Sequence, residues 1–399
     1  MMARKRQRSS SDIADVRKKQ LTELPVDALV DILLRLPAKS VCCIKCVSKT
    51  LLNVVNNIFF STLHTRSHTT DQVPRLICCS RHHPLLTLQS LKYKDNSVTN
   101  DRHAITISSS TYSFLRFVFC NLFCLGFKNG DSMLINPLGE RGILRLPETS
   151  FAGLENNSLF GMGFDDKTNT YKIICVSCHD RGKSKTAHVL VLGTNSWRQI
   201  SSLPPCELSR ISDEPPVCAN GAVHWLIMGQ VRGDRRIVSF DFRREEFCWT
   251  RTPPTLQSSN KHHGNYLEWN ICLFSLRGCL AIAVTKFRWS IGDTIMEVWV
   301  LKDSDENQWV RYYYSNELPA GFPLKFLGFP GEWEHGIFFT NYKIFEPSFF
   351  FIDLRSGSIS TVKYKCSMRT FLLGMHSYSE TLISLKDYGD LEEAHEVIT

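Results

Sequence analysis

A repeating pattern of strands and turns occupies most of this chain, from about residue 110 to residue 385. In each repeat, segments rich in Val, Ile, Phe, Tyr and Trp alternate with turn residues, as in AVHWLIM, GQVRGD, RRIVSFDF and EFCWTRTPP. The repeat length of roughly 50 to 60 residues matches one four-stranded blade of a kelch-type β-propeller. The alternative, a β-sandwich, does not explain a repeat of this length. The third strands are expected to end near Asn136, Gly193, Asp241, Lys302 and Asp353.

The two ends of this region supply the strands that complete the count. PRLICCSR and LLTLQSLKY predict two strands before the first full repeat, and FLLGMHSYSETLISLKDYG predicts two strands after the last. Pairing these strands closes a ring and leaves no open sheet edge. We therefore predict a mixed but mainly β chain whose propeller has six blades, the last of them built from both ends of the domain.

Residues 21–65 have a helical pattern instead. Pro25 suits the start of a first helix, in which the polar residues Asp27, Asp31 and Arg35 fall on one narrow stripe while apolar side chains cover the rest. Two further short helices are predicted to follow. A unit of about 40 residues is near the limit for independent folding. Its excess apolar surface must be covered either by a second protein or by the rest of the same chain.

This helical region resembles the F-box domain in the form common in plants. The resemblance rests on Leu24-Pro25, Leu29, Ile32-Leu33, Arg35-Leu36-Pro37, Cys46-Val47-Ser48-Lys49, Phe59-Phe60 and Leu63-His64. Leu51 stands where the family usually has Trp. The resemblance implies docking on a Skp-type adaptor and, through it, on a cullin of a ubiquitin ligase. The adaptor-binding residues that it implies are Leu24, Pro25, Leu29, Ile32, Leu33, Leu36, Pro37, Val47, Lys49 and Leu51.

The repeat region resembles the plant F-box-associated domain over about residues 110 to 385, through GMGFDDKTNTYKIICV, VLVLGTNSWRQI, NGAVHWL, IVSFDFRREEF and MEVWVLKD. Together, the two resemblances imply the substrate-recognition subunit of an SCF-type ubiquitin ligase, whose propeller binds an unknown substrate protein. The alternative is a propeller scaffold that never meets a cullin. In NGAVHW, Asn220-Gly221 predicts a tight hairpin turn. His224 and Trp225 are expected on opposite strand faces, with Trp225 packed between blades.

Motifs of catalysis and metal binding are absent from the sequence. There is no H-E-x-x-H, no G-x-S-x-G and no strand-linked G-x-G-x-x-G, which argues against an enzyme. Cys175 and Cys178 lack the second ligand pair of a zinc site. Asp165-Asp166 indicates a turn rather than a catalytic carboxylate pair. We therefore predict a non-catalytic receptor with no cofactor and no metal.

Positive charge is concentrated at the N-terminus. Residues 1–20 contain seven Arg and Lys and two Asp, a net +5, so only +3 of the total +8 remains for the rest of the chain. This balance does not indicate nucleic-acid binding, and the basic tail is either disordered or a nuclear-import signal. No stretch has the ~18 uninterrupted apolar residues of a membrane span. Without a secretory signal, the 15 cysteines are expected as reduced thiols in the cytoplasm, the nucleus or both.

The predicted organisation is a basic tail at 1–20, an F-box at 21–65, a linker at 66–74, the propeller at 75–388 and a polar tail at 389–399. Long loops on a rigid scaffold commonly carry function. The second-to-third-strand loops and the blade-to-blade loops should share one rim, and they are predicted at 92–113, 179–186, 202–216, 229–234, 254–270 and 288–293. The candidate substrate contacts in them are Arg181, Lys183, Lys185, Arg232, Lys261, His262, His263, Arg288 and Trp289.

Overall fold

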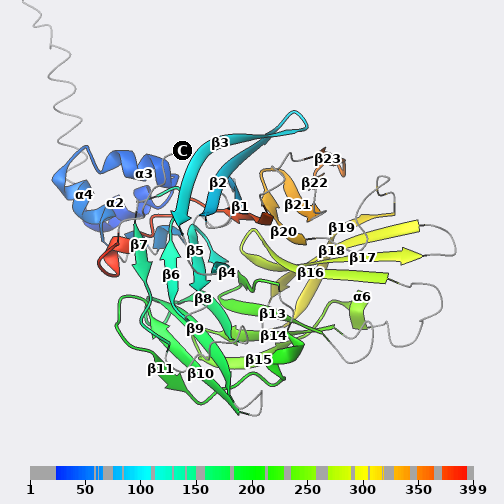
Figure 1. Ribbon diagram of the computed structural model, residues 1–399. Coiled ribbons are helices and arrows are strands. Elements are labelled where there is room, and N and C mark those ends of the chain that lie inside the picture. Colours follow the sequence, from blue (N-terminus) through cyan, green and yellow to red (C-terminus); the bar gives the residue numbers. More distant parts are fainter. Residues whose placement is uncertain are drawn as a thin grey trace, which may run out of the picture. The chain divides into compact units, whose positions relative to one another are not determined.

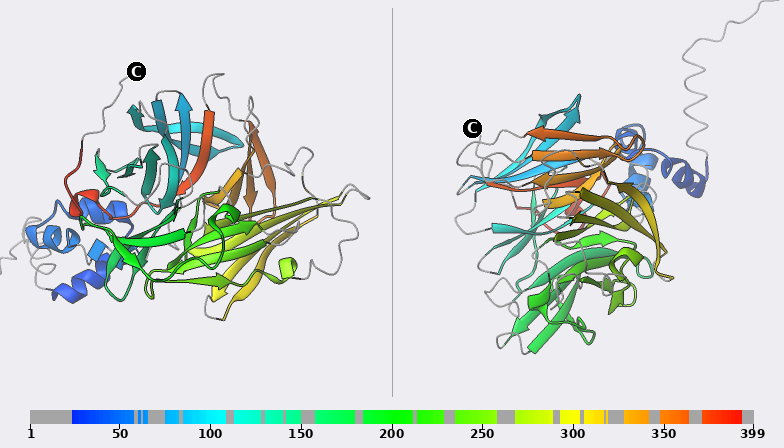
Figure 2. Two further views of the ribbon diagram at one scale, coloured as in Figure 1. Left: turned by 60° about the horizontal axis from the view of Figure 1, so that its bottom comes forward. Right: turned by 90° about the vertical axis from the view of Figure 1, so that its right-hand side faces the viewer.

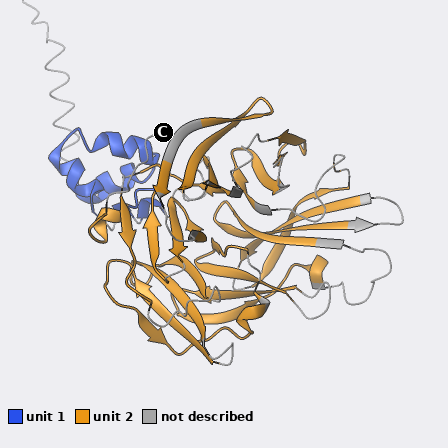
Figure 3. Ribbon diagram, in the orientation of Figure 1, with its two compact units in different colours: residues 1–72, 381–383 blue, residues 73–380, 384–399 orange. Residues whose placement is uncertain are grey.

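The computed structural model of the chain is shown in Figure 1. The chain divides into two compact units (Figure 3): unit 1 consists of Met1–Gln72 and Thr381–Ile383, and unit 2 consists of Val73–Glu380 and Ser384–Thr399. The residues that the structure describes are 24–57, 60–61, 63–65, 75–82, 85–108, 113–127, 130–139, 142–149, 158–179, 184–211, 214–228, 235–257, 268–288, 293–303, 306–316, 318, 328–341, 348–363 and 371–392.

Unit 1 contains the three predicted helices, α2 (Val26–Leu33), α3 (Ala38–Ile44) and α4 (Lys49–Val55). Pro25 and Pro37 stand directly before α2 and α3, where a proline removes no intrahelical hydrogen bond. Ser48 caps α4, because its Oγ accepts a hydrogen bond of 3.2 Å from the Leu51 backbone N–H. The described residues from 60 to 65 are helical as well.

The core of unit 1 is small, and it takes a contribution from the far end of the chain. Its buried side chains are Leu29, Leu33, Val41, Leu51, Val54, Val55 and Phe60. Leu382 packs against this cluster, and residues 381–383 accordingly belong to unit 1. The sequence-based assignment of these residues to a propeller strand is wrong, since they lie outside any strand. A helical unit of this size gains from each added core side chain.

Unit 2 contains six four-stranded antiparallel sheets (Figures 1 and 2), as predicted. We number these sheets as blades, with each strand order as the hydrogen bonds give it. Blade 1 is β24 (Phe371–Tyr378), β1 (Arg75–His82), β2 (Leu85–Lys94) and β3 (Ser97–Ser108). Blade 2 is β4 (Ser113–Phe119), β5 (Leu122–Phe127), β6 (Ser132–Ile135) and β7 (Ile143–Arg145). Blade 3 is β8 (Leu159–Asp165), β9 (Thr170–His179), β10 (Ser184–Val191) and β11 (Arg198–Ile200).

The remaining blades follow in chain order. Blade 4 is β12 (Val217–Ala219), β13 (Ala222–Met228), β14 (Arg235–Asp241) and β15 (Glu246–Thr250). Blade 5 is β16 (Glu268–Leu276), β17 (Cys279–Arg288), β18 (Asp293–Asp303) and β19 (Gln308–Ser315). Blade 6 is β20 (Gly328–Trp333), β21 (Gly336–Asn341), β22 (Ser348–Asp353) and β23 (Ile359–Lys363). The short helices η2 (Leu208–Arg210), α6 (Pro254–Gln257) and η4 (Leu385–Asp387) lie in connections.

Blade 1 closes the ring with strands from both ends of the domain. β24 pairs antiparallel with β1, for example at Met375 opposite Cys78. Joint closure is therefore confirmed, but its composition differs from the prediction: one C-terminal strand joins three N-terminal ones. The missed strand is β3, which lies within the predicted loop 92–113. β3 is the last strand of its sheet, and its polar sequence SVTNDRHAITIS hides the alternation of a buried strand.

Apolar side chains fill the spaces between neighbouring blades. Ile174 of blade 3 and Trp225 of blade 4 share one buried cluster, so the predicted position of Trp225 between blades is confirmed. His224 is also buried, with its Nδ1 2.6 Å from Ser239 Oγ and its Nε2 3.1 Å from the Ala219 carbonyl oxygen. Since a carbonyl can only accept, Nε2 carries the proton and Nδ1 accepts from the Ser239 hydroxyl.

The last described residues return to blade 2. Glu392 and Ile143 exchange two backbone hydrogen bonds of 2.9 Å. The Arg145 Nε also donates to Glu392 Oε1 at 2.6 Å. Glu392, which the sequence places in a polar tail, therefore pairs with the outer strand of blade 2.

Candidate functional site

Unit 1 exposes large apolar side chains over its helices. Val47 is 63% exposed, Val26 is 56% exposed and Ile32 is 46% exposed, and Leu24 and Leu52 are also exposed. We call these five residues, taken together, the apolar face of unit 1. Exposed apolar surface of this kind is a candidate site of protein interaction.

The predicted adaptor-binding residues divide into two groups. Exposed ones can meet a partner directly, whereas buried ones hold the helices that present them. Val26 and Leu52 join the exposed group although the sequence did not single them out, because their exposure depends on how the helices pack. The exposed residues are Leu24, Pro25, Ile32, Pro37, Val47 and Lys49, Leu36 is half-buried, and the buried residues are Leu29, Leu33 and Leu51.

Leu51 has a different environment from the exposed members of this set. The family usually has Trp at this position, and the sequence places Leu51 among the adaptor contacts. In the structure Leu51 is buried in the core of unit 1 beside Leu33 and Val54. Leu51 therefore supports the α4 end of the apolar face from inside and offers little surface to a partner.

His64 fixes the loop that enters α3. Its Nε2 donates to the Leu36 carbonyl oxygen at 2.6 Å, and its ring lies 5.9 Å from the ring of buried Phe60. Since Leu36 directly precedes Pro37, this bond fastens the segment between α2 and α3. The Phe and His of the motif thus act in the structure as supports of the helices.

The connections of unit 2 divide between two rims. Antiparallel strands place the first-to-second and third-to-fourth turns on one rim, which we call the turn rim. The second-to-third and blade-to-blade connections lie on the other, which we call the loop rim. The turn rim contains two-residue turns with positive φ, at Asn220-Gly221 and at Arg277-Gly278, the geometry of tight hairpins. The predicted turn at Asn220-Gly221 is confirmed.

Lys185 is the one predicted substrate contact whose side chain the structure describes. Its Nζ donates to the backbone oxygens of Pro204 and Cys206 at 3.0 and 2.8 Å. Lys185 therefore holds a blade-to-blade connection, and its role as a substrate contact stays a prediction. Arg288 ends β17, with its side chain outside the described part. The others stay predictions outside the described residues: Arg181, Lys183, Arg232, Lys261, His262, His263 and Trp289.

Hydrogen bonds join neighbouring blades along the turn rim. They connect the ends of first strands, so that each links one blade to the next. Such bonds make the turn rim rigid and leave the loop rim as the side with room to vary. The bonds are Asn220 N to the Gly278 carbonyl (3.0 Å), Arg277 N to Glu332 Oε2 (2.8 Å), Glu332 N to Ser377 Oγ (2.7 Å) and Ser379 N to the Cys120 carbonyl (3.3 Å).

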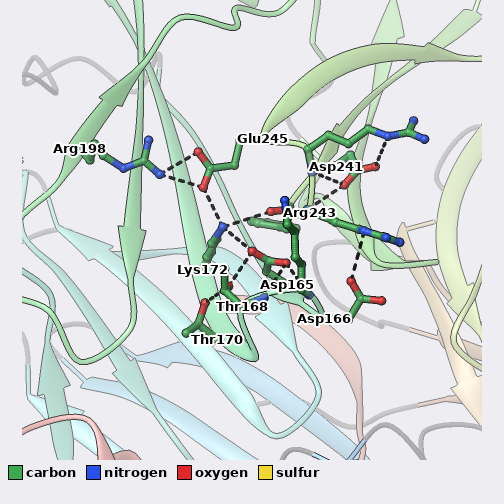
Figure 4. A network of polar contacts seen from close by, with 12 residues as sticks. Asp165, Asp166, Thr168, Thr170, Lys172, Arg198, Asp241, Arg243 and Glu245 are labelled. Carbon is green, nitrogen blue, oxygen red and sulfur yellow. Dashed lines mark hydrogen bonds and ion pairs between the residues drawn. The ribbon is translucent and has the colours of Figure 1, made fainter.

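A buried ionic network ties blade 3 to blade 4 at the same rim (Figure 4). The Lys172 Nζ lies 2.6 Å from Asp165 Oδ2 and 2.7 Å from Glu245 Oε1. Arg198 Nη2 donates to both carboxylate oxygens of Glu245, at 2.8 and 2.7 Å. Asp165 also accepts from the Lys167 backbone N–H at 2.9 Å, so the sequence-based interpretation of Asp165 as a turn residue is confirmed.

The pKa values of this network favour its charged form. Burial by itself raises the pKa of Asp165, but hydrogen bonds from Lys172 and Thr168 outweigh it and leave that pKa below its usual value. Burial likewise lowers the pKa of Lys172, and the two carboxylates outweigh it, so the net pKa is raised. The network thus contributes to folding rather than to proton transfer.

The described part of the chain contains no cluster suited to a metal ion. No group of three or more His, Cys, Asp and Glu there is placed to hold a metal ion. Burial raises the pKa of Cys124 and Cys175 to about 12, so these thiols do not supply a thiolate at neutral pH. No described helix has the length and apolar character needed to cross a membrane.

Comparison with known proteins identifies both units. Residues 75–379 match the family described as F-box associated beta propeller domain, and residues 21–61 match the F-box domain. F-box protein At5g65850 of Arabidopsis thaliana is 27% identical over 324 residues, which are 79% of this chain and 76% of the relative. F-box protein DOR of Arabidopsis thaliana is 25% identical, with 75% of this chain and 76% of the relative covered. Among solved structures, the Dos1 propeller covers 73% of this chain and 68% of its own, at 14% identity and a TM-score of 0.32.

Proposed function

Because the chain belongs to the F-box associated β-propeller family and also has an F-box domain, we propose that it is the substrate-recognition subunit of an SCF-type ubiquitin ligase. In this proposal unit 1 docks on a Skp-type adaptor, which binds a cullin, and the propeller binds the substrate protein. The observation that supports it most is the apolar face of unit 1, with Val26, Ile32 and Val47 about half exposed or more.

The apolar face fits a protein partner for an energetic reason. Burying a Val or Ile side chain contributes about 1.5–3 kcal/mol, so a few such side chains are enough for a stable interface. The face also includes Leu24 beside Pro25, whose ring restricts the backbone before α2. A preordered apolar surface loses little conformational entropy on binding.

The propeller has the properties expected of the receptor part. Its ring is closed by paired strands and its turn rim is fixed by interblade bonds. The loop rim is therefore the side that can differ between relatives without loss of the scaffold. In this role the chain holds a substrate near the conjugating enzyme and raises its effective concentration. The thioester chemistry belongs to other subunits, and the chain itself is a non-catalytic receptor that uses no cofactor.

A second candidate is a propeller scaffold that works outside ubiquitin ligation. The apolar face would then bind a different protein. Both candidates are compatible with the cytoplasm, the nucleus or both, where the described cysteines, all of them free, stay reduced.

Reconstitution distinguishes the two candidates. The full chain is mixed with a plant Skp-type adaptor and a cullin–RING core, and complexes are separated by size. The proposal predicts that all components elute together and that ubiquitin is transferred to the chain's own lysines when the conjugating enzymes are added. Val47→Asp should prevent both. Elution of the chain apart from adaptor and cullin would favour the scaffold.

A further inference from the structure

Arg116 occupies a β-bulge in the first strand of blade 2. Cross-strand pairing between β4 and β5 passes from Leu115 directly to Phe117, so Arg116 has no partner residue in β5. A bulge of this kind turns a side chain away from its regular direction. The guanidinium carbon of Arg116 lies 3.8 Å from the ring centroid of Phe160 in β8 and 4.9 Å from that of Phe114. The bulge thus places a cation between blades 2 and 3.

The Arg116 guanidinium has no anionic partner in the described part of the chain. Its Nε is buried without a hydrogen-bond partner, and no described carboxylate forms an ion pair with it. Buried charges in proteins are normally paired. Burial accordingly lowers the pKa of Arg116. Arg311 offers a contrast, because it stacks 5.2 Å from the Tyr314 ring but also has Glu297 Oε1 at 3.7 Å.

The neighbouring backbone makes room for this side chain. A Cβ atom at Gly126 would collide with the Arg116 Nε, so glycine permits the position of the guanidinium. Phe114 and Phe160 are each the second residue of their strand, and Gly126 is the last but one of β5. All three therefore lie close to the loop rim, which is the side that we assign to the substrate.

We propose that Arg116 is the anion-binding residue of a site between blades 2 and 3, and that its ligand is a carboxylate or phosphate group of a peptide. Stacking on Phe160 occupies the face of the guanidinium and leaves its edge for paired N–H···O bonds to an oxyanion. This inference rests on the proposed function, since it names an acidic or phosphorylated segment as the substrate class. It is nevertheless measured without adaptor or cullin.

The test uses the full chain and two simple anions. Melting temperature is followed in sodium phosphate, sodium acetate and sodium chloride at equal ionic strength. A ligand at about ten times its Kd should raise the melting temperature by about 2–4 °C over chloride, and the rise should saturate. Arg116→Met keeps the apolar stem and should lose the rise. Gly126→Ala keeps the charge but displaces it, and should lose the rise too. Arg311→Met, the matched stacked arginine, should retain it.

Each possible result either identifies the anion or overturns the proposal. A saturable rise with phosphate alone assigns a phosphorylated group, a rise with acetate alone assigns a carboxylate, and a rise with both assigns the shared oxyanion chemistry. The proposal is overturned if neither anion acts on the wild-type chain, or if Arg116→Met responds like the wild type. A fall of the Arg116→Met melting temperature in chloride by more than the anion-induced rise would also overturn it, because Arg116 would then be structural.

Discussion

Unit 1 and unit 2 differ in how much apolar surface they leave exposed to water. Unit 1 is much the smaller, yet it contributes five of the eleven exposed large apolar side chains found among the described residues. Unit 2 places its apolar side chains in clusters between blades and closes its ring with β24. Unit 2 thus buries its apolar surface within one chain, whereas unit 1 leaves apolar side chains uncovered. Under the proposed function, the uncovered side chains of the helices bind the adaptor and the fixed rim of the propeller binds the substrate.

The largest effect is expected from opening the ring. Removal of 371–399 deletes β24 and leaves the backbone of β1 without a partner. It also removes Leu382 from the core of unit 1. An unpaired edge promotes aggregation, so we expect the truncated chain to aggregate or to lose cooperative unfolding in urea. Removal of 1–20 is the control and should leave the transition in place. A cooperative transition in the 371–399 deletion would mean that the propeller does not need its closing strand.

Leu33→Asp should separate the two units. Leu33 is buried in the small core of unit 1, so a carboxylate there costs about 4–5 kcal/mol, enough to unfold that unit. All eight Trp residues lie between Trp197 and Trp333, so tryptophan fluorescence follows unit 2 alone. We expect hydrogen exchange to lose protection in 26–55 while the fluorescence transition stays unchanged. Protection that survives in Leu33→Asp would contradict the assigned core.

Lys172→Met should weaken the joint between blades 3 and 4. It leaves the buried Asp165 and the half-buried Glu245 without their shared cation, at a cost of about 3–4 kcal/mol. Urea unfolding followed by tryptophan fluorescence measures this loss. Arg198→Met is the matched control, since the Arg198 side chain is 58% exposed, and exposed pairs contribute little. Equal stability of Lys172→Met and wild type would show that the network makes no net contribution to the free energy of unfolding.

Acid should destabilise unit 2 through its buried histidines. Burial lowers the pKa of His224 and of His376 to about 4. The unfolded chain therefore takes up protons first as pH falls below about 6.5. Between about pH 6.5 and pH 4, each of the two histidines lowers the free energy of unfolding by up to about 3 kcal/mol. Burial also raises the pKa of Glu214 to about 7 and of Glu332 to about 6, which acts in the opposite sense, since that stability is lost as pH rises.

The contribution of His224 to this pH dependence is isolated by replacing it with a side chain that does not titrate. Between about pH 7 and pH 4, His224→Gln should lose less unfolding free energy than the wild type, because one of the two histidine contributions is gone. The measurement is urea unfolding at several pH values. Parallel pH profiles for both proteins would show that His224 is not held neutral by the fold.

The architecture could be predicted because its signals are local and repeated. The blade period and turn residues such as Asn220-Gly221 indicate a propeller without any knowledge of contacts. β3 was missed because an outer strand needs only one apolar face, and its sequence SVTNDRHAITIS is largely polar. Leu382 and Glu392 were missed because their partners lie far away along the chain, and no local pattern reports such pairing.

The surroundings of the candidate site residues could not be predicted from the sequence, for the same reason. The helical pattern identifies apolar residues, but only packing decides that Leu51 is buried and that Val26 is exposed. The hydrogen bonds of Lys185 to the 204–206 segment likewise depend on the fold, and the loop sequence does not indicate them. Arg116 lies within a strand, whereas the sequence-based substrate candidates are residues of predicted loops. Exposure and pairing are properties of the assembled fold.

The central claim is that the apolar face of unit 1 binds a Skp-type adaptor, and affinity measured with matched surface charges tests it most directly. Val47→Asp puts a charge on a valine of unit 1 that is 63% exposed, and Val310→Asp does the same on a valine of unit 2 that is 42% exposed. Titration calorimetry of the full chain with the adaptor should show tight binding for wild type and for Val310→Asp. For Val47→Asp it should show affinity lower by about 100-fold or more, since each ~1.4 kcal/mol is tenfold. Equal affinity of Val47→Asp and wild type, or no binding by the wild-type chain, would contradict the account.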